Sequence, residues 1–414
     1  MIDINNQNTP LEFESGAAAG RGVLGYWQVF RKRIGAGDLG ALPVVAGLVI
    51  IWAVFQILNP FFLSAANLSN LALECAAIGT IAVGVVLVLL IAQIDLSIGS
   101  IGGLASAVVA YGFVLHGWPL WLSIVVAVIA AVAIGLIYGL IFTRFGVPSF
   151  VITLAGLMGF LGLQLAILGT NGSINIPFDS WVVVFAQQMF IPAPVAYVLV
   201  AIAVGLYVTS TYLNSRRRSA AGLSATSSRE IFFKSALLVV LLGAASWYLN
   251  TSRGIGLMFL LFVLIVIVMN YALTRTRWGR SVYAIGGNVE AARRAGIPVN
   301  RVVISVFILG TTLAAIGGIL ATARLASAGV SSGGGDTNLV AIAAAVIGGT
   351  SLFGGRGNAW SALLGIVVIQ SIASGLTLLS LSSSIRFMIT GSVLLLAVVI
   401  DSLSRRSRAM HGQG

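Results

Sequence analysis

The fold of this chain is decided by residues 68–91, LSNLALECAAIGTIAVGVVLVLLI, in which Glu74 is the one charged side chain. A bilayer core about 30 Å thick is crossed by roughly 20 consecutive apolar residues in an α-helix. A short polar break, QIDLSIGS at residues 93–100, follows this stretch, and apolar sequence then resumes. We therefore expect a membrane-spanning helix followed by unwound backbone, which membranes tolerate only where it is buried in protein or lines water.

The composition of the whole chain is that of a membrane protein. Of its 414 residues, 58% are apolar and 8% are charged, and the mean hydropathy is +1.05. A soluble domain has about a quarter of its residues charged, so soluble enzymes, DNA-binding modules and disordered tails are excluded. Glycine contributes 49 residues, an excess that in membrane helices permits close packing.

Apolar stretches between charges and turn residues give twelve candidate spans, of which the tenth and the twelfth are short for a full crossing. We predict an all-α polytopic bundle of about 10–12 transmembrane helices, built as a pseudo-repeat of two halves with broken or re-entrant segments at 93–100 and 348–358. The candidates are residues 41–58, 68–91, 98–115, 120–142, 150–168, 194–213, 231–249, 255–273, 302–323, 339–353, 359–379 and 385–400.

The basic residues predict the orientation of these spans. With the N-terminus in the cytoplasm, the positive-inside rule places twenty of the 23 Lys and Arg residues inside and leaves Arg253, Arg324 and Arg386 outside. The net charge of +12 is then a topology signal and not a nucleic-acid surface. We expect both termini to be cytoplasmic. The predicted parts are a tail at 1–40, a transmembrane domain at 41–403 and a second tail at 404–414.

The sequence lacks the residue patterns of enzymes and metal sites. Cys75 is the single cysteine, and His116 and His411 lie far apart, so neither an internal disulfide nor a metal cluster is expected. No phosphate-binding loop, nucleophile elbow or zinc-protease motif occurs. We expect no cofactor, no metal and no enzymatic activity.

Two long hydrophilic connections lie on the predicted cytoplasmic side. Residues 214–230 are typical of a flexible basic linker, to which we give no catalytic role. Residues 274–301 predict instead a short helix: Asn288 can cap its first turn, Glu290 lies where the helix dipole favours an anion, and Gly296 suits a left-handed residue after its end. Such a short helix needs a surface to dock on, which could be its own bundle or a partner protein.

Polar side chains within apolar sequence are candidates for a translocation pathway. Each has a structural alternative. Asp95 is interpreted more simply as an N-cap that accepts hydrogen bonds from the amides near Ser97, and glutamines in lipid commonly bond between helices. The candidates are Gln93, Asp95, Ser97, Gly99, Gln164, Thr350 and Ser351.

Five segments make the chain resemble the permease subunits of bacterial ABC-type monosaccharide importers, the ribose, galactose and xylose group. The extra helix pair around 231–273 is similar to the xylose-type branch. The segments are 67–70 (NLSN), 94–100 (IDLSIGS), 147–156 (VPSFVITLAG), 283–293 (YAIGGNVEAAR) with Gly296 and Ile297, and 341–351 (AIAAAVIGGTS).

This resemblance implies a function and partners. It implies import of a monosaccharide, a pentose such as D-xylose, through the bacterial inner membrane. A periplasmic binding protein would deliver the sugar, a separate cytoplasmic ATP-binding subunit would drive transport, and a second permease copy would complete a homodimer. The loop that seats in the ATP-binding subunit would comprise Gly286, Gly287, Asn288, Glu290, Ala291, Arg293, Gly296 and Ile297.

Two places depart from the pattern of that family. Gln93 and residues 338–340 stand where relatives often carry acidic groups, which we expect near an outer mouth, so the identity of the sugar stays open. The alternative function is an ion-coupled secondary sugar carrier, with Asp95 and Glu74 as candidate coupling acids. A membrane-embedded enzyme would need a cluster of nucleophile and base, which the sequence does not offer.

Overall fold

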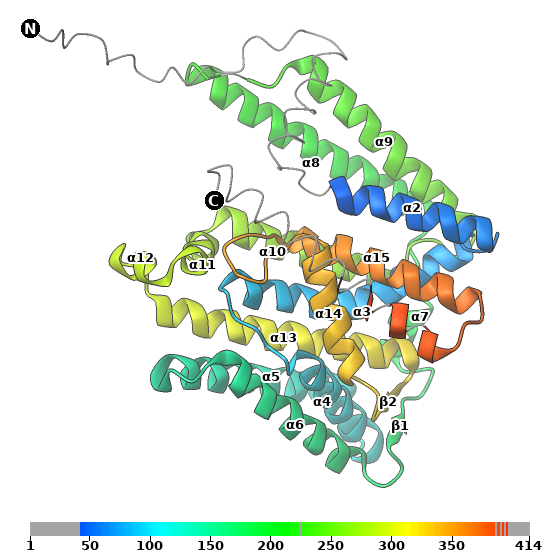
Figure 1. Cartoon of the computed structure of the whole chain (residues 1–414). Coiled ribbons are helices and arrows are strands. Elements are labelled where there is room, and N and C mark those ends of the chain that lie inside the picture. The colour runs from blue at the N-terminus through cyan, green and yellow to red at the C-terminus, as the bar shows by residue number, and fades with distance from the viewer. Residues whose placement is uncertain (1–41, 224, 386, 390, 393–394, 396–414) are drawn as a thin grey trace, which may run out of the picture.

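The computed structural model of the chain is a helical bundle whose long helices run between two ends (Figure 1). It describes residues 42–223, 225–385, 387–389, 391–392 and 395. The elements are α2 (Leu42–Leu58), α3 (Ala65–Leu90), α4 (Ile98–Ala110), the π-helical turn η1 (Tyr111–Leu115), α5 (Leu120–Phe145), α6 (Ser149–Leu168), β1 (Ser173–Asn175), α7 (Trp181–Gln187), α8 (Ala193–Ala220), α9 (Ser228–Asn250), α10 (Leu257–Arg275), α11 (Arg277–Gly287), α12 (Val289–Arg294), α13 (Val299–Leu325), β2 (Ser327–Gly329), α14 (Gly335–Ile347) and α15 (Ala359–Leu378).

Within the described residues, nine helices are long and apolar enough to cross a membrane, and two shorter apolar helices, Pro43–Leu58 and Asp336–Ile347, accompany them. The predicted all-α polytopic class is therefore confirmed. Every candidate span up to 359–379 corresponds to one of these helices. Most of the last candidate, 385–400, and both terminal tails lie outside the described residues.

Both predicted breaks are present as non-helical backbone. Residues 91–97 separate α3 from α4, so the first break starts and ends earlier than the predicted 93–100, and residues 98–100 belong to α4. Ala92 in this break has a φ of 57°. Residues 348–358 separate α14 from α15. Helix α14 begins before the predicted range of 339–353. It also ends before residue 353, because the glycine-rich run from Gly348 onward cannot continue the helix. The pseudo-repeat of two halves stays a prediction.

The core lies where α3, α4 and α13 pack together, and glycine makes the approach possible. A methyl group on Gly317 would lie 2.7 Å from the carbonyl oxygen of Ala77 in α3, and one on Gly318 would overlap the carbonyl oxygen of Gly102 in α4. Small residues let membrane helices gain van der Waals contact at short range, where no hydrophobic effect drives them together. The glycine excess of the sequence therefore serves helix packing, as predicted.

Helices α8 and α9 form a hairpin that stands away from the core (Figure 1). Helix α8 buries only Ala196 and Val204. The prediction of a flexible linker at 214–230 is wrong for its first part, since α8 continues to Ala220 and carries the three arginines that begin at Arg216. Straight-chain residues extend a helix that has already nucleated, and basic side chains suit its negative end.

Small elements at one end of the bundle were not predicted. Strands β1 and β2 pair antiparallel, with Ile174 opposite Ala328, and α7 is a helix of seven residues. A strand of three residues gives no detectable periodicity.

Candidate functional site

The structure separates two groups of basic residues. Helices α5 and α13 run antiparallel with Gly139 against Ile304, so Arg144 at the end of α5 lies near Arg301 at the start of α13. We call this the basic end; α11, α12 and the second break also lie there. Arg324, at the far end of α13, lies at the opposite end, which we call the cavity end.

The predicted capped helix at the basic end is confirmed as α12. The side chain of Asn288 accepts a hydrogen bond from the amide of Ala291 at 2.9 Å, and Gly296 has a φ of 79°. Glu290 and Arg293 form an ion pair at 2.9 Å, and both side chains are more than half exposed. Ala292 is buried against the bundle. One face of α12 therefore docks on the chain itself, and the charged face is exposed.

The preceding helix, α11, was not predicted, and it fixes α12 to the membrane helices. The side chain of Thr276 caps α11 by accepting a hydrogen bond from the amide of Gly279 at 3.1 Å. A threonine at this position is an N-cap signal that could have predicted the start of α11 from the sequence. The hydroxyl of Tyr283 donates to the carbonyl oxygen of Gly357 in the second break at 2.7 Å. Burial raises the pKa of Tyr283 above its ordinary value of about 10, so the phenol stays protonated and remains a donor.

Gly286 lies inside this junction. A methyl group there would overlap the carbonyl oxygen of Leu90 at the end of α3, and would lie 2.5 Å from the amide nitrogen of Gly355. That amide donates to Leu90 at 2.9 Å, so both breaks and α11 meet at one point. Of the predicted coupling residues, Gly286 is buried and Ile297 half-buried; Gly287, Asn288, Glu290, Ala291, Arg293 and Gly296 are exposed.

The first break is held by buried hydrogen bonds. Asp95 accepts from the amide of Ser97 at 2.8 Å and from its hydroxyl at 2.7 Å, and Ser97 also accepts from Tyr138 at 2.9 Å. The predicted hydrogen bond from the amide of Ser97 to Asp95 is therefore confirmed, but Asp95 is not the N-cap of α4, because Ser97 occupies that position and no side chain caps the helix. The side chain of Asn338 in α14 bonds to the amide of Gly99 and to the carbonyl oxygen of Leu96.

The other pathway candidates occupy separate positions. Gln164 donates to the carbonyl oxygens of Gly329 and Ser332, each at 2.9 Å, and is buried. Thr350 and Ser351 are buried in the second break. Gln93 is half-buried and follows the end of α3, at the basic end and not at the mouth of the cavity described below. A role of these residues in translocation stays a prediction.

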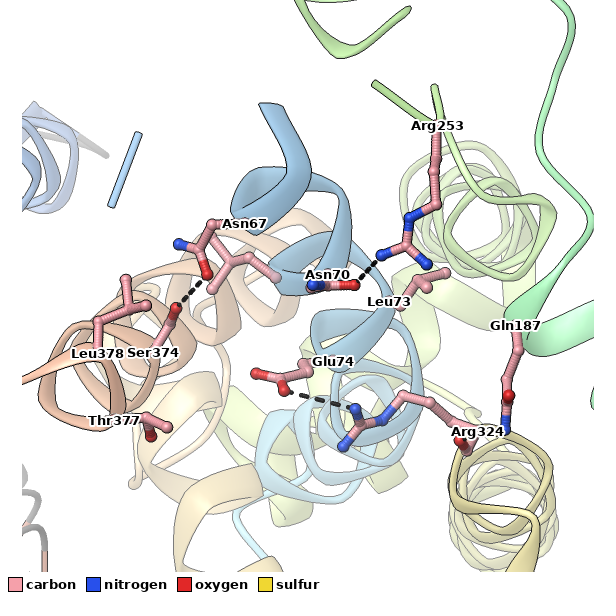
Figure 2. A pocket seen from close by; sticks show the side chains of 11 residues that line it. Asn67, Asn70, Leu73, Glu74, Gln187, Arg253, Arg324, Ser374, Thr377 and Leu378 are labelled. Atoms are coloured by element: carbon pink, nitrogen blue, oxygen red, sulfur yellow. Dashed lines mark hydrogen bonds and ion pairs between the residues drawn. The ribbon is translucent and has the colours of Figure 1, made fainter. Parts of the chain in front are cut away.

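The cavity end contains a polar cavity of about 440 Å³ between α3, α13, α15 and the chain entering α10 (Figure 2). None of the seven predicted pathway residues lines it. Eight polar or charged side chains and three leucines do so: Asn67, Asn70, Glu74, Gln187, Arg253, Arg324, Ser374 and Thr377, with Leu71, Leu73 and Leu378.

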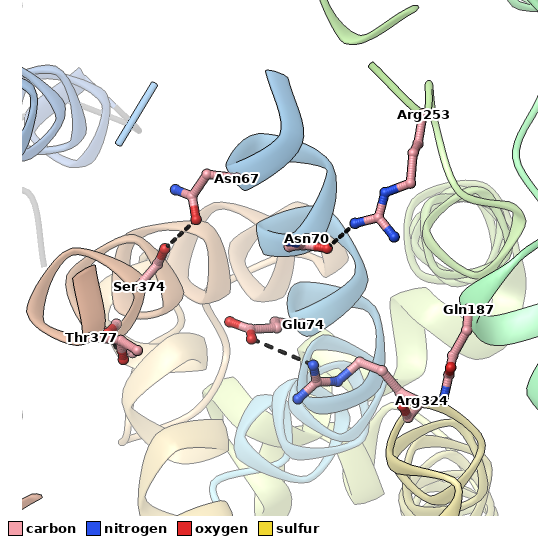
Figure 3. A network of polar contacts seen from close by, with 9 residues as sticks. Asn67, Asn70, Glu74, Gln187, Arg253, Arg324, Ser374 and Thr377 are labelled. Atoms are coloured by element: carbon pink, nitrogen blue, oxygen red, sulfur yellow. Dashed lines mark hydrogen bonds and ion pairs between the residues drawn. The ribbon is translucent and has the colours of Figure 1, made fainter. Parts of the chain in front are cut away.

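Polar contacts cross this cavity (Figure 3). Glu74 and Arg324 form an ion pair at 3.4 Å, and the guanidinium of Arg253 donates to Asn70. Ser374 donates to Asn67 at 3.1 Å. The sequence analysis did not predict this cavity, although the sequence contained a signal for it. Two of the three basic residues that the positive-inside rule places outside, Arg253 and Arg324, line the cavity.

Among the described residues, no three His, Cys, Asp or Glu side chains lie together as a group that could hold a metal ion.

Comparisons with known proteins place these features in a family. The model of the family described as the branched-chain amino acid transport system permease component matches residues 67–398. The chain is 36% identical to the xylose transport system permease protein of Escherichia coli K12 over 370 residues, 89% of this chain and 93% of that one. It is 32% identical to the ribose import permease protein of Bacillus subtilis over 375 residues, 90% and 97% of the two chains. No solved structure matches the chain.

Proposed function

The chain belongs to the branched-chain amino acid transport system permease family, and from that membership we propose that it is the membrane-spanning subunit of an ATP-driven monosaccharide importer. Its relatives are transport permeases, so the chain is a transport subunit and not an enzyme. These relatives, together with the nine helices in the described part of the chain that are long and apolar enough to cross a membrane, make it a multi-pass inner-membrane protein.

The substrate class rests on the relatives. The family description names branched-chain amino acids, whereas the relatives that cover nearly all of this chain are named for xylose, ribose, allose and fructose. The highest identity among them is to xylose permeases. A pentose such as D-xylose is therefore the proposed substrate, delivered by a periplasmic binding protein.

The observation that carries the ATP-driven mechanism is the junction between α11 and the two breaks. Helix α12 offers an exposed charged face, and α11 packs without free space at Gly286 against the end of α3. A cytoplasmic ATP-binding subunit that docks on α12 and moves it would thus displace both breaks together. The basic end then faces the cytoplasm, as the positive-inside rule requires, with both termini on that side and a second copy of the permease as partner.

The test reverses the charge of one residue on α12. The variant Glu290→Arg removes the ion pair to Arg293 and changes the docking face, but an exposed pair contributes only about 0–1 kcal/mol to stability. Glu230→Arg is the matched control, since Glu230 forms a similar pair with Lys234 on α9. We expect ATP-dependent uptake of labelled D-xylose or D-ribose, and recovery of an ATP-binding subunit on gentle purification, for wild type and control but not for Glu290→Arg.

Two outcomes would contradict this proposal. Uptake in liposomes by the chain alone, without ATP and abolished by a proton ionophore, would establish the secondary carrier instead. Normal uptake and normal recovery of the partner by Glu290→Arg would remove α12 as the coupling element.

A further inference from the structure

We propose that the cavity lined by Glu74 and Arg324 is a binding site for the transported monosaccharide within a single permease subunit. The inference rests on the proposed function and adds the residues that would hold the sugar. The cavity's volume of about 440 Å³ falls in the range of small-molecule sites, roughly 300–1,000 Å³. Most of its lining is polar, in a chain of which only 8% is charged.

The lining matches the chemistry of a neutral polyol. Each sugar hydroxyl both donates and accepts hydrogen bonds, and the amides of Asn67, Asn70 and Gln187 offer both kinds of partner. The carboxylate of Glu74 only accepts, and the guanidinium of Arg324 only donates, so together they can bind neighbouring hydroxyls. The leucines supply an apolar surface for the C–H groups of the ring.

Glu74 and Arg324, whose ion pair crosses the cavity, can each form further hydrogen bonds. Its separation of 3.4 Å exceeds the 2.7–2.9 Å typical of charge-assisted hydrogen bonds. The side chains of Arg324 and Glu74 are 32% and 31% exposed, which leaves atoms of both accessible from the cavity. A ligand can therefore add hydrogen bonds to both groups without removing a tight pair.

Two contacts hold the side chain of Arg253 at the rim of the cavity. Its guanidinium donates to Asn70 and lies 5.2 Å from the centre of the Phe190 ring, a cation–π contact that fixes its position. Because Arg253 approaches from the chain before α10 and Asn70 belongs to α3, a sugar bound between them would bridge two elements.

The cavity reaches along α3 as far as Glu74. Glu74 lies nine residues after the start of α3, which at 1.5 Å per residue corresponds to about 14 Å of depth. No residue of α3 beyond Glu74 lines the cavity. A sugar entering from the cavity end would therefore meet Glu74 at the greatest depth that the cavity reaches along α3.

Two other ligand classes fit less well. An anionic ligand could pair with Arg253, but Arg324 is already paired with Glu74, whose carboxylate would repel the anion. A free branched-chain amino acid could pair its charged groups with Glu74 and Arg253, but its aliphatic side chain would meet a largely polar wall. L-leucine is therefore a useful competing probe.

The chain's single cysteine makes a direct test practical, because Cys75 is buried. In the full assembly in nanodiscs, the variant Thr377→Cys places a thiol on the lining, and a water-soluble maleimide reports its accessibility. We expect transport-saturating D-xylose to slow labelling at least about threefold, as two-thirds occupancy requires. Ser173→Cys, exposed at the same end but outside the cavity, should be unaffected by sugar. Labelling slowed by L-leucine and not by sugar would overturn the ligand class.

A second test separates binding from a purely structural ion pair. Glu74→Gln should reduce sugar protection and uptake at least about tenfold, as expected for loss of a charged hydrogen-bond partner. The double exchange Glu74→Arg with Arg324→Glu restores a pair but moves the acceptor, so it should not restore uptake; full restoration would show that the pair is only structural.

The two proposals fail in different ways. If the wild-type assembly moves neither D-xylose nor D-ribose nor another monosaccharide, the proposed function is wrong and this inference falls with it. If wild type transports sugar but shows no protection of Thr377→Cys, and Glu74→Gln transports normally, only the cavity site is wrong.

Discussion

Replacing Gly286 by alanine should uncouple α11 from the membrane helices, whereas the same change at Gly287 should be silent. The added methyl group at position 286 would overlap the carbonyl oxygen of Leu90 and lie 2.5 Å from the nitrogen of Gly355. Ordinary contact between such atoms requires about 3.5 Å, so Gly355 must move by about 1 Å and Leu90 by more. Both are backbone atoms, which cannot rotate away as a side chain could.

The expected cost follows from that displacement. Overpacking of a close-packed interior typically costs about 1–3 kcal/mol. At Gly287, in contrast, nothing lies within 4 Å of an added methyl group, so Gly287→Ala should change stability by less than about 0.5 kcal/mol. The pair isolates packing, because both positions are glycines at the end of the same helix.

The assay compares the two variants in the same assembly. Detergent-solubilised membrane proteins often unfold irreversibly, so the half-life at a fixed temperature is the suitable measure of stability. We expect a shortened half-life for Gly286→Ala and a lower uptake of sugar per ATP hydrolysed, with wild-type values for Gly287→Ala. Equal behaviour of the two variants would refute the junction as the link between α11 and α3.

Three further outcomes are expected. Tyr283→Phe should lose the hydrogen bond to Gly357 and about 0.5–1.5 kcal/mol, and uptake measured at constant ATPase activity should fall; an unchanged ratio would contradict it. Asn338→Ala should leave buried polar groups unpaired around the first break and destabilise the bundle by about 1–3 kcal/mol, measured as thermal inactivation. Gly318→Ala should force α13 away from α4 and reduce the yield of folded protein, whereas Gly205→Ala on lipid-facing α8 should not.

The membrane helices could be predicted because bilayer insertion depends on length and hydropathy, which are local properties of the sequence. Helix α12 could be predicted for a similar reason, since Asn288 and Gly296 act within one turn of their own positions. The breaks could be found from glycine and polar residues in apolar sequence. That they meet at Gly286 could not, because the contact joins three segments far apart in the chain.

The polar cavity escaped prediction for the same reason. Glu74 was visible as an acid in an apolar helix, and Arg324 as a cation on the outer side, but their pairing spans 250 residues and depends on how α3 lies against α13. Two residues predicted to line a pathway, Asp95 and Gln164, bond to backbone and near neighbours, yet each keeps one buried oxygen without a partner, and their role in translocation stays a prediction. In lipid an unpaired polar group costs so much that most are used for packing, and the sequence does not tell which are left over.

The α8–α9 hairpin buries few residues, so it adds little to the core of the bundle. The hairpin contacts the start of α3, and Tyr248 donates to the carbonyl oxygen of Leu63, just before that helix, at 2.9 Å. Helices α8 and α9 otherwise bury few residues within the chain, so in a membrane acyl chains would cover most of their surface. Each of its helices satisfies its own backbone hydrogen bonds, so the pair can lie in lipid without packing against other helices of the chain. Bilayer thickness and lipid composition should therefore affect this flank first. A chain of this architecture could gain or lose such a hairpin during evolution without repacking its interior.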